Sequence, residues 1–236
     1  HLCDRRQRQM CIRDRIDIIA NIASILGFTM QMNDKFFAHG MNKEQADNEM
    51  LLLFLKQLSV KSKAIKEIHQ KYHSLSNDFR LVAVFLTNPV IYEKIVTNRS
   101  RALKNALKES LQTPSARIAQ TQLSAQLRPC FENLLVSIKD ESHLSVEFSG
   151  INDCEMKAIL RKILNAQKEI FQLHQQFCGI MKTIGSYPLG NWGDSEFDFI
   201  KTNQRVFISD FYSIIDYADI ILMGYLDIYH CALNLK

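Results

Sequence analysis

The spacing of apolar residues predicts a chain built from long helices. From 152 to 184, apolar side chains recur at alternating steps of three and four residues, which places them on one face of a helix packed against others. The same spacing runs through 42–75, and 207–235 is strongly apolar. We therefore predict an all-α, mostly antiparallel bundle of about seven or eight helices, in which these three are the longest.

Prolines predict where three further helices begin. In Asn88–Pro89 and Thr113–Pro114, a side-chain acceptor precedes a proline. Proline suits the first helical position, where its missing N–H does no harm. These pairs predict helices over 89–112 and 114–127, and Pro129 predicts a new helix through 138.

Polar residues predict other boundaries. Asn42 and Asn152 are each followed three residues later by Gln or Glu, which is the pattern of a capping box at a helix start. The polar cluster at 76–78 predicts a turn after the first long helix, and the turn leads into another apolar helix over 79–86.

The first fifteen residues are predicted to be foreign to the protein. Residues 10–15 have the sequence that one reading frame of a common transposase library adapter encodes, so we exclude 1–15 and treat 16–236 as a single all-α domain. A genuine basic N-terminal arm is the alternative. Without 1–15, the chain has 24 basic and 23 acidic residues. The net positive charge of the whole chain therefore does not indicate a nucleic-acid partner.

The stretch 16–32 opens with an apolar run. The run is shorter than the roughly 20 residues of a membrane-spanning helix, contains Asn21 and Ser24, and follows Asp17. We predict a buried helix here. The alternative is the end of a membrane span or signal segment, which would give a membrane contact through 16–32.

The cysteines predict free thiols. Four lie beyond the first fifteen residues, namely Cys130, Cys154, Cys178 and Cys231, and no two are close enough to form a CxxC motif. This spacing indicates neither a zinc site nor a disulfide framework. Free thiols are typical of a reducing compartment, so we expect a cytoplasmic protein.

Two polar residues interrupt the apolar face of the central helix. Gln167 and His174 lie seven residues apart on that face. Polar residues at such positions often fix the register of packed helices and the choice of partner. We predict this role, with a solvent-filled gap or a functional histidine as the alternatives.

The loop at 185–193 is the most distinctive in the chain. It holds three of the eight glycines, one of the four prolines and the only tryptophan. Such loops bind ligands, or they connect helices while an aromatic ring closes the end of the bundle. Tyr187 and Trp192 are therefore candidate interaction residues. The glycine spacing matches no phosphate-binding motif.

The last helix carries a polar stripe. At 100° per residue, Asp216, Asp219, Asp227 and His230 fall within an arc of about 80°. Asp227 and His230 lie one turn apart, as in carboxylate-bridged metal bundles, but such bundles need two of these pairs together with further acidic residues. We predict that the stripe faces solvent. A metal or catalytic site is the alternative, and it requires the stripe to face inward.

These observations favour a non-catalytic interaction or scaffolding module of a microbial protein. No catalytic motif is present, and no cofactor is indicated. We expect a protein partner or a homo-oligomer, with an apolar patch left exposed on the monomer. The alternatives are a bundle-core enzyme or metal-binding protein that uses the stripe, and a membrane-associated protein.

Overall fold

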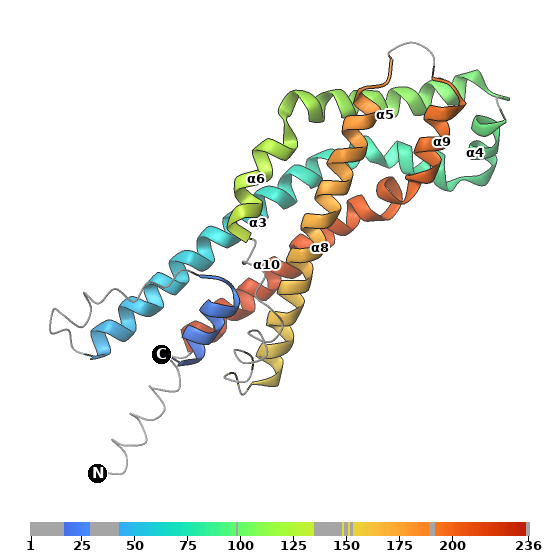
Figure 1. Ribbon diagram of the computed structural model, residues 1–236. Helices are drawn as coiled ribbons and strands as arrows, with labels where there is room; N and C mark the ends of the chain where they lie inside the picture. The colour runs from blue at the N-terminus through green and yellow to red at the C-terminus, as the bar shows by residue number, and fades with distance from the viewer. Residues whose placement is uncertain are drawn as a thin grey trace. The chain divides into compact units, whose positions relative to one another are not determined.

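The structure is a computed structural model that describes residues 17–28, 43–97, 99–134, 148, 151, 153–188 and 192–234. Within these ranges every regular element is helical, and the helices pack in a bundle (Figure 1). The predicted all-α bundle is therefore confirmed. The predictions made for 1–15, for 29–32 and for the caps Asn42 and Asn152 lie outside the described residues.

Helix α3 (Lys43–Thr87) continues well beyond the predicted end at residue 75. The turn predicted at 76–78 was wrong, because the helix continues through these three residues. The hydroxyl of Ser76 donates to the backbone carbonyl of His73, and Asp78 forms an ion pair with Arg117. Phe79 then continues the buried face with no exposed surface.

Helix α4 (Pro89–Val96) begins as the sequence predicted. The Asn88 side chain accepts hydrogen bonds at 3.1 Å from the backbone N–H groups of Val90 and Ile91. The prediction of one helix over 89–112 was wrong, because α4 ends at residue 96. Ser100 then caps α5 (Arg101–Thr121), where its hydroxyl accepts a hydrogen bond from the N–H of Leu103.

Pro114 and Pro129 lie inside α5 and α6 (Leu123–Leu134), so the predicted helix starts at these two positions were wrong. An internal proline removes one helical hydrogen bond. Packing offsets this loss in α5, where Pro114 and Ser115 are buried. The chain breaks instead at Gln122, between the two helices.

Helix α8 (Cys154–Gly185) matches the predicted central helix. Its start is capped by Asp153, whose carboxylate accepts hydrogen bonds from the N–H groups of Glu155 at 2.8 Å and Met156 at 3.3 Å. The predicted helix over 207–235 is present as α10 (Phe211–Asn234), preceded by one π-helical turn, η1 (Val206–Asp210).

Contacts divide the chain into two compact units, and the long helices run through both. The first comprises the described residues of His1–Ile65, Glu132–Gln167 and Ile220–Lys236, and the second those of Lys66–Phe131 and Lys168–Asp219. The assignment of 16–236 to a single domain stays a prediction.

Neighbouring helices of the second unit run antiparallel. Phe79 of α3 stacks on Phe207, which precedes α10, with ring centroids 6.0 Å apart, whereas His69, earlier in α3, lies 3.2 Å from Asp219, later in α10. Helices α5 and α6 also run antiparallel to α8. Gln112 of α5 contacts Pro188, just beyond the end of α8, whereas Phe131, later in the chain in α6, contacts Phe171, earlier in α8. This is the up–down–up–down order of a four-helix bundle.

In the first unit, the prediction of a buried helix in 16–32 is confirmed for the described residues 17–28. Residues 17–25 are helical, and Ile22, Ile25 and Leu26 are buried. None of the described helices combines the length and the apolar character needed to cross a membrane.

Lys61, also in the first unit, is a buried cation. Its Nζ donates to the backbone carbonyl of Asn133, in the last turn of α6, at 2.6 Å and lies 5.6 Å from the centre of the Phe28 ring. Burial lowers the pKa of Lys61 to about 8. The carbonyls at the C-terminal end of a helix carry partial negative charge, which suits a cation at this position.

Candidate functional site

A groove of about 970 Å³ opens in the second unit where α5 meets α6. The end of α5, the start of α6 and the last turns of α8 line it, together with Tyr187 just beyond α8. Ligand pockets commonly have volumes of about 300–1,000 Å³. The groove is therefore large enough to hold a small molecule or a short helical segment.

The groove exists because the chain changes direction between α5 and α6 (Figure 1). Gln122 makes this corner with φ 48° and ψ 49°, in the left-handed region. A residue with a Cβ rarely adopts this conformation, and it costs roughly 1–2 kcal/mol. Strained backbone of this kind concentrates at functional sites, so the position of Gln122 at the groove supports the groove as a candidate site.

Replacing Gln122 by glycine should stabilise the protein. Glycine adopts the left-handed conformation without the Cβ penalty, so Gln122→Gly should raise the free energy of unfolding by up to about 1 kcal/mol. Gln126→Gly, at an exposed position within α6, should lower it by about 1 kcal/mol. Urea unfolding of both variants measures the difference, and equal effects would contradict the strain at Gln122.

The groove is lined mainly by apolar side chains, several of which are small, and it also carries positive charge. Ala119, Leu123 and Met181 are among its apolar residues. Its charged residues are Arg128 and Lys182, and no Asp or Glu is among the lining residues that the structure describes. An apolar groove with this charge suits an occupant that is apolar on one side and acidic at its edges.

The distinctive loop borders this groove. Tyr187 is half-buried and lines the groove, whereas Trp192 is buried against it, with ring centroids 5.5 Å apart. Trp192 also packs on Phe197, and Tyr187 on Phe199, both from α9 (Asp194–Thr202). The structure thus brings the two predicted aromatic residues together. Trp192 is buried among these rings, and Tyr187 lines the groove.

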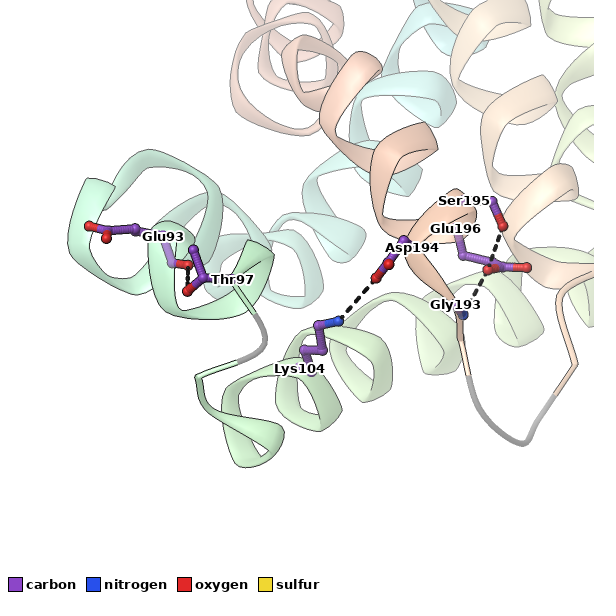
Figure 2. Close-up of polar contacts among 7 residues, drawn as sticks. All are labelled: Glu93, Thr97, Lys104, Gly193, Asp194, Ser195 and Glu196. Carbon is purple, nitrogen blue, oxygen red and sulfur yellow. Dashed lines mark hydrogen bonds and ion pairs between the residues drawn. The ribbon is translucent and has the colours of Figure 1, made fainter.

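Polar contacts fix α9 beside the loop. The carboxylate of Glu196 accepts hydrogen bonds from the backbone N–H of Gly193 at 2.8 Å and the hydroxyl of Ser195 at 2.9 Å (Figure 2). Lys104 of α5 lies 3.6 Å from the Asp194 carboxylate and 4.8 Å from the centre of the Phe197 ring. These contacts join α9 to α5, and they hold the aromatic residues of the loop in place.

The predicted histidine lies in the core of the second unit. His174 is buried, and its Nδ1 is 2.8 Å from the hydroxyl of Tyr72. The Phe131 ring packs on it, with centroids 4.4 Å apart. The Sγ of Cys178, which lines the groove, is 3.8 Å from Nδ1. These side chains link the core to the groove surface.

Burial keeps this cluster neutral. It lowers the pKa of His174 to about 4 and raises that of Cys178 to about 11. A nucleophilic cysteine needs a lowered thiol pKa, usually beside a protonated histidine. In the Cys178–His174 pair, the thiol pKa is raised and the histidine pKa is lowered, so neither side chain is charged. These electrostatics suit a packed core and not covalent catalysis.

Gln167, the other predicted polar residue of α8, has its own partner in the first unit. Its Nε2 donates to the hydroxyl of Tyr225 in α10 at 2.8 Å, and both side chains are buried. A paired polar group in the core favours one register of the two helices, because any shift would leave both groups unsatisfied.

The four residues of the predicted metal alternative are all exposed: Asp216, Asp219, Asp227 and His230. The inward orientation that a bundle-core site requires is therefore absent. In the part of the chain that the structure describes, no group of three or more His, Cys, Asp or Glu side chains is arranged to hold a metal ion. Asp219 does meet a histidine of another helix, His69.

Sequence reasoning missed the groove, Tyr72 and the proximity of Cys178 to His174. The spacing of four residues between His174 and Cys178 places both on one face of a helix, and this signal could have identified the pair. Comparison of the chain with protein-family models, curated proteins and solved structures gives no match.

Proposed function

We propose that the protein is a non-catalytic helical interaction module that assembles with itself. In this assembly, the exposed face of α10 from one copy occupies the groove beside Tyr187 in another. The single observation that carries the proposal is the groove itself, which has an apolar, positively charged lining.

The occupant is suggested by an exposed apolar row on α10. Met223 is 60% exposed, and Ile220 and Leu226 beside it are 41% and 46% exposed. Apolar side chains gathered on one helix face are typical of a surface that another protein covers. This exposed row is an observation in support of the proposed interaction module.

Charge supports the pairing of this row with the groove. Helix α10 carries Asp216, Asp219 and Asp227 on the same exposed face and contains no Lys or Arg. The groove carries Arg128 and Lys182. Opposite charges at the edges of an apolar contact speed association and exclude wrong partners.

Two further observations support a non-catalytic, cytoplasmic role. The neutral state of Cys178 and His174 disfavours nucleophilic chemistry at Cys178, a thiol that lines the groove. Cys130, Cys154, Cys178 and Cys231 are all free thiols, as is typical of proteins in a reducing compartment.

Self-association should depend on both surfaces. We expect a concentration-dependent oligomer in analytical ultracentrifugation and native mass spectrometry of the full chain. Lys182→Glu in the groove and Met223→Glu on α10 should each weaken it by about tenfold or more, because each places an acidic group against an apolar or acidic surface. High salt should weaken it further.

The matched controls are Lys201→Glu, at an exposed lysine of α9 outside the groove, and Leu81→Glu, at an exposed leucine of α3. Both should leave the association constant unchanged. A wild-type chain that stays monomeric at every concentration would contradict self-assembly. An oligomer that the controls weaken as much as Lys182→Glu does would place the interface elsewhere.

A further inference from the structure

We propose that His69 and His73 of α3 form a binding site for a divalent transition metal, with Asp219 of α10 holding the first imidazole in place. The site lies within the second unit, and both of its proposed metal ligands belong to α3, although Asp219 also lies on the face of α10 used in the proposed self-association. The spacing of the two histidines, their exposure and the contact with Asp219 support it.

The two histidines have the spacing of a helical metal chelate. Residues four apart on a helix face one another, with Cβ atoms about 5–6 Å apart. Two histidines at this spacing supply the imidazole ligands of zinc in helical metal motifs. Here the rings of His69 and His73 already lie side by side, with centroids 5.9 Å apart and 27° between their planes.

Asp219 orients the first ligand. Its Oδ1 lies 3.2 Å from Nε2 of His69. This contact favours the neutral tautomer whose proton is on Nε2, so that Nδ1 keeps the lone pair that a metal needs. Carboxylates that hold a metal-binding histidine in this way fix its ring and raise its basicity. Asp219 thus acts as a positioning residue and not as a metal ligand.

The site is accessible, and its geometry needs one adjustment. His73 is exposed, and His69 is partly exposed. The ring of His73 has to turn so that one of its nitrogens meets the metal together with Nδ1 of His69, at about 2.0–2.1 Å for zinc. An exposed side chain makes such a turn readily, because rotamer changes at the surface take only picoseconds to nanoseconds. Water completes the coordination.

This arrangement does not require a ready-made cluster of three protein ligands, of which the described residues contain none. It also gives Asp219 a role different from the one considered in the sequence, where it was grouped with Asp216, Asp227 and His230. Those three side chains take no part in the proposed site.

The test is isothermal titration of the full chain with Zn²⁺. We expect His73→Ala and His69→Ala each to remove one zinc equivalent from the total bound by the wild type. Asp219→Asn should still bind that zinc equivalent, but with an affinity about 10–100-fold lower, because an amide can donate as well as accept and so no longer fixes the His69 tautomer. His230→Ala, which removes an exposed histidine from α10, should bind as the wild type does.

Thermal unfolding gives a second measurement. A metal bound only to the native state stabilises it by mass action. Zinc should therefore raise the midpoint temperature of unfolding of the wild type and of His230→Ala, and it should raise that of His73→Ala by less. Absence of zinc binding by the wild type would overturn the proposal. Equal zinc affinity and stoichiometry in the wild type and His73→Ala would overturn it as well.

Discussion

Phe79→Ala should lower the free energy of unfolding by about 3–5 kcal/mol, the usual loss when a buried phenylalanine becomes alanine. Phe79 has no exposed surface. Its ring centroid lies 4.9 Å from that of Phe211 and 5.4 Å from that of Phe177. The truncation would open a cavity among these rings and remove their edge and face contacts. Urea unfolding followed by far-ultraviolet circular dichroism would measure the loss.

Leu81→Ala is the matched control for this substitution. Leu81 lies two residues away on the same helix but is half exposed, so the change should stay within about 0.5 kcal/mol. The comparison also tests the burial of Phe79. Similar, small losses of stability in the two variants would contradict its packing among the rings of Phe177 and Phe211.

The sequence predicted the long helices because their apolar residues repeat regularly over many turns. The limits of α8 agree closely with the prediction for that reason. Local signals were less reliable. The capping side chain and proline at Asn88–Pro89 start α4 as expected, but the similar pair at Thr113–Pro114 lies within α5. Burial of Pro114 offsets its missing hydrogen bond, and the local sequence carries no sign of that burial.

The candidate site could be predicted only in part. Periodicity placed His174 on the buried face of α8, and the structure confirms that burial. Its partner Tyr72 is 102 positions away in the sequence, in an ordinary helical stretch that marks no site. The groove depends on a left-handed backbone at Gln122, a conformation that glutamine rarely adopts. No local pattern therefore indicated the corner at which the groove opens.

His174 should make the protein sensitive to acid between about pH 6.5 and pH 4. Its pKa falls from 6.5 to about 4 in the folded chain because burial disfavours the charged ring. The unfolded chain therefore binds more protons in this interval, and the stability of the folded state falls as pH falls. A shift of this size corresponds to a loss of about 3 kcal/mol that is complete below about pH 4. Above pH 6.5, the contribution is fully present.

Protonation would also change the hydrogen bond between the His174 ring and Tyr72. With its proton on Nε2, His174 accepts a hydrogen bond from the Tyr72 hydroxyl at Nδ1, and a proton on Nδ1 would abolish this acceptor. The Tyr72 hydroxyl cannot respond by ionising, because burial raises its pKa well above the usual value. Protonation would thus leave a buried charge and would require the Tyr72 hydroxyl to turn from donor to acceptor.

His174→Gln isolates this effect, because glutamine offers an acceptor to Tyr72 but does not titrate in this range. The variant should be less stable than the wild type near neutral pH, and its stability should fall by about 3 kcal/mol less between pH 6.5 and pH 4. His230→Gln, at an exposed histidine, should reproduce the wild-type profile. Unfolding in urea at a series of pH values measures all three. Parallel profiles for the wild type and His174→Gln would mean that His174 titrates equally in both states, which contradicts its burial against Tyr72.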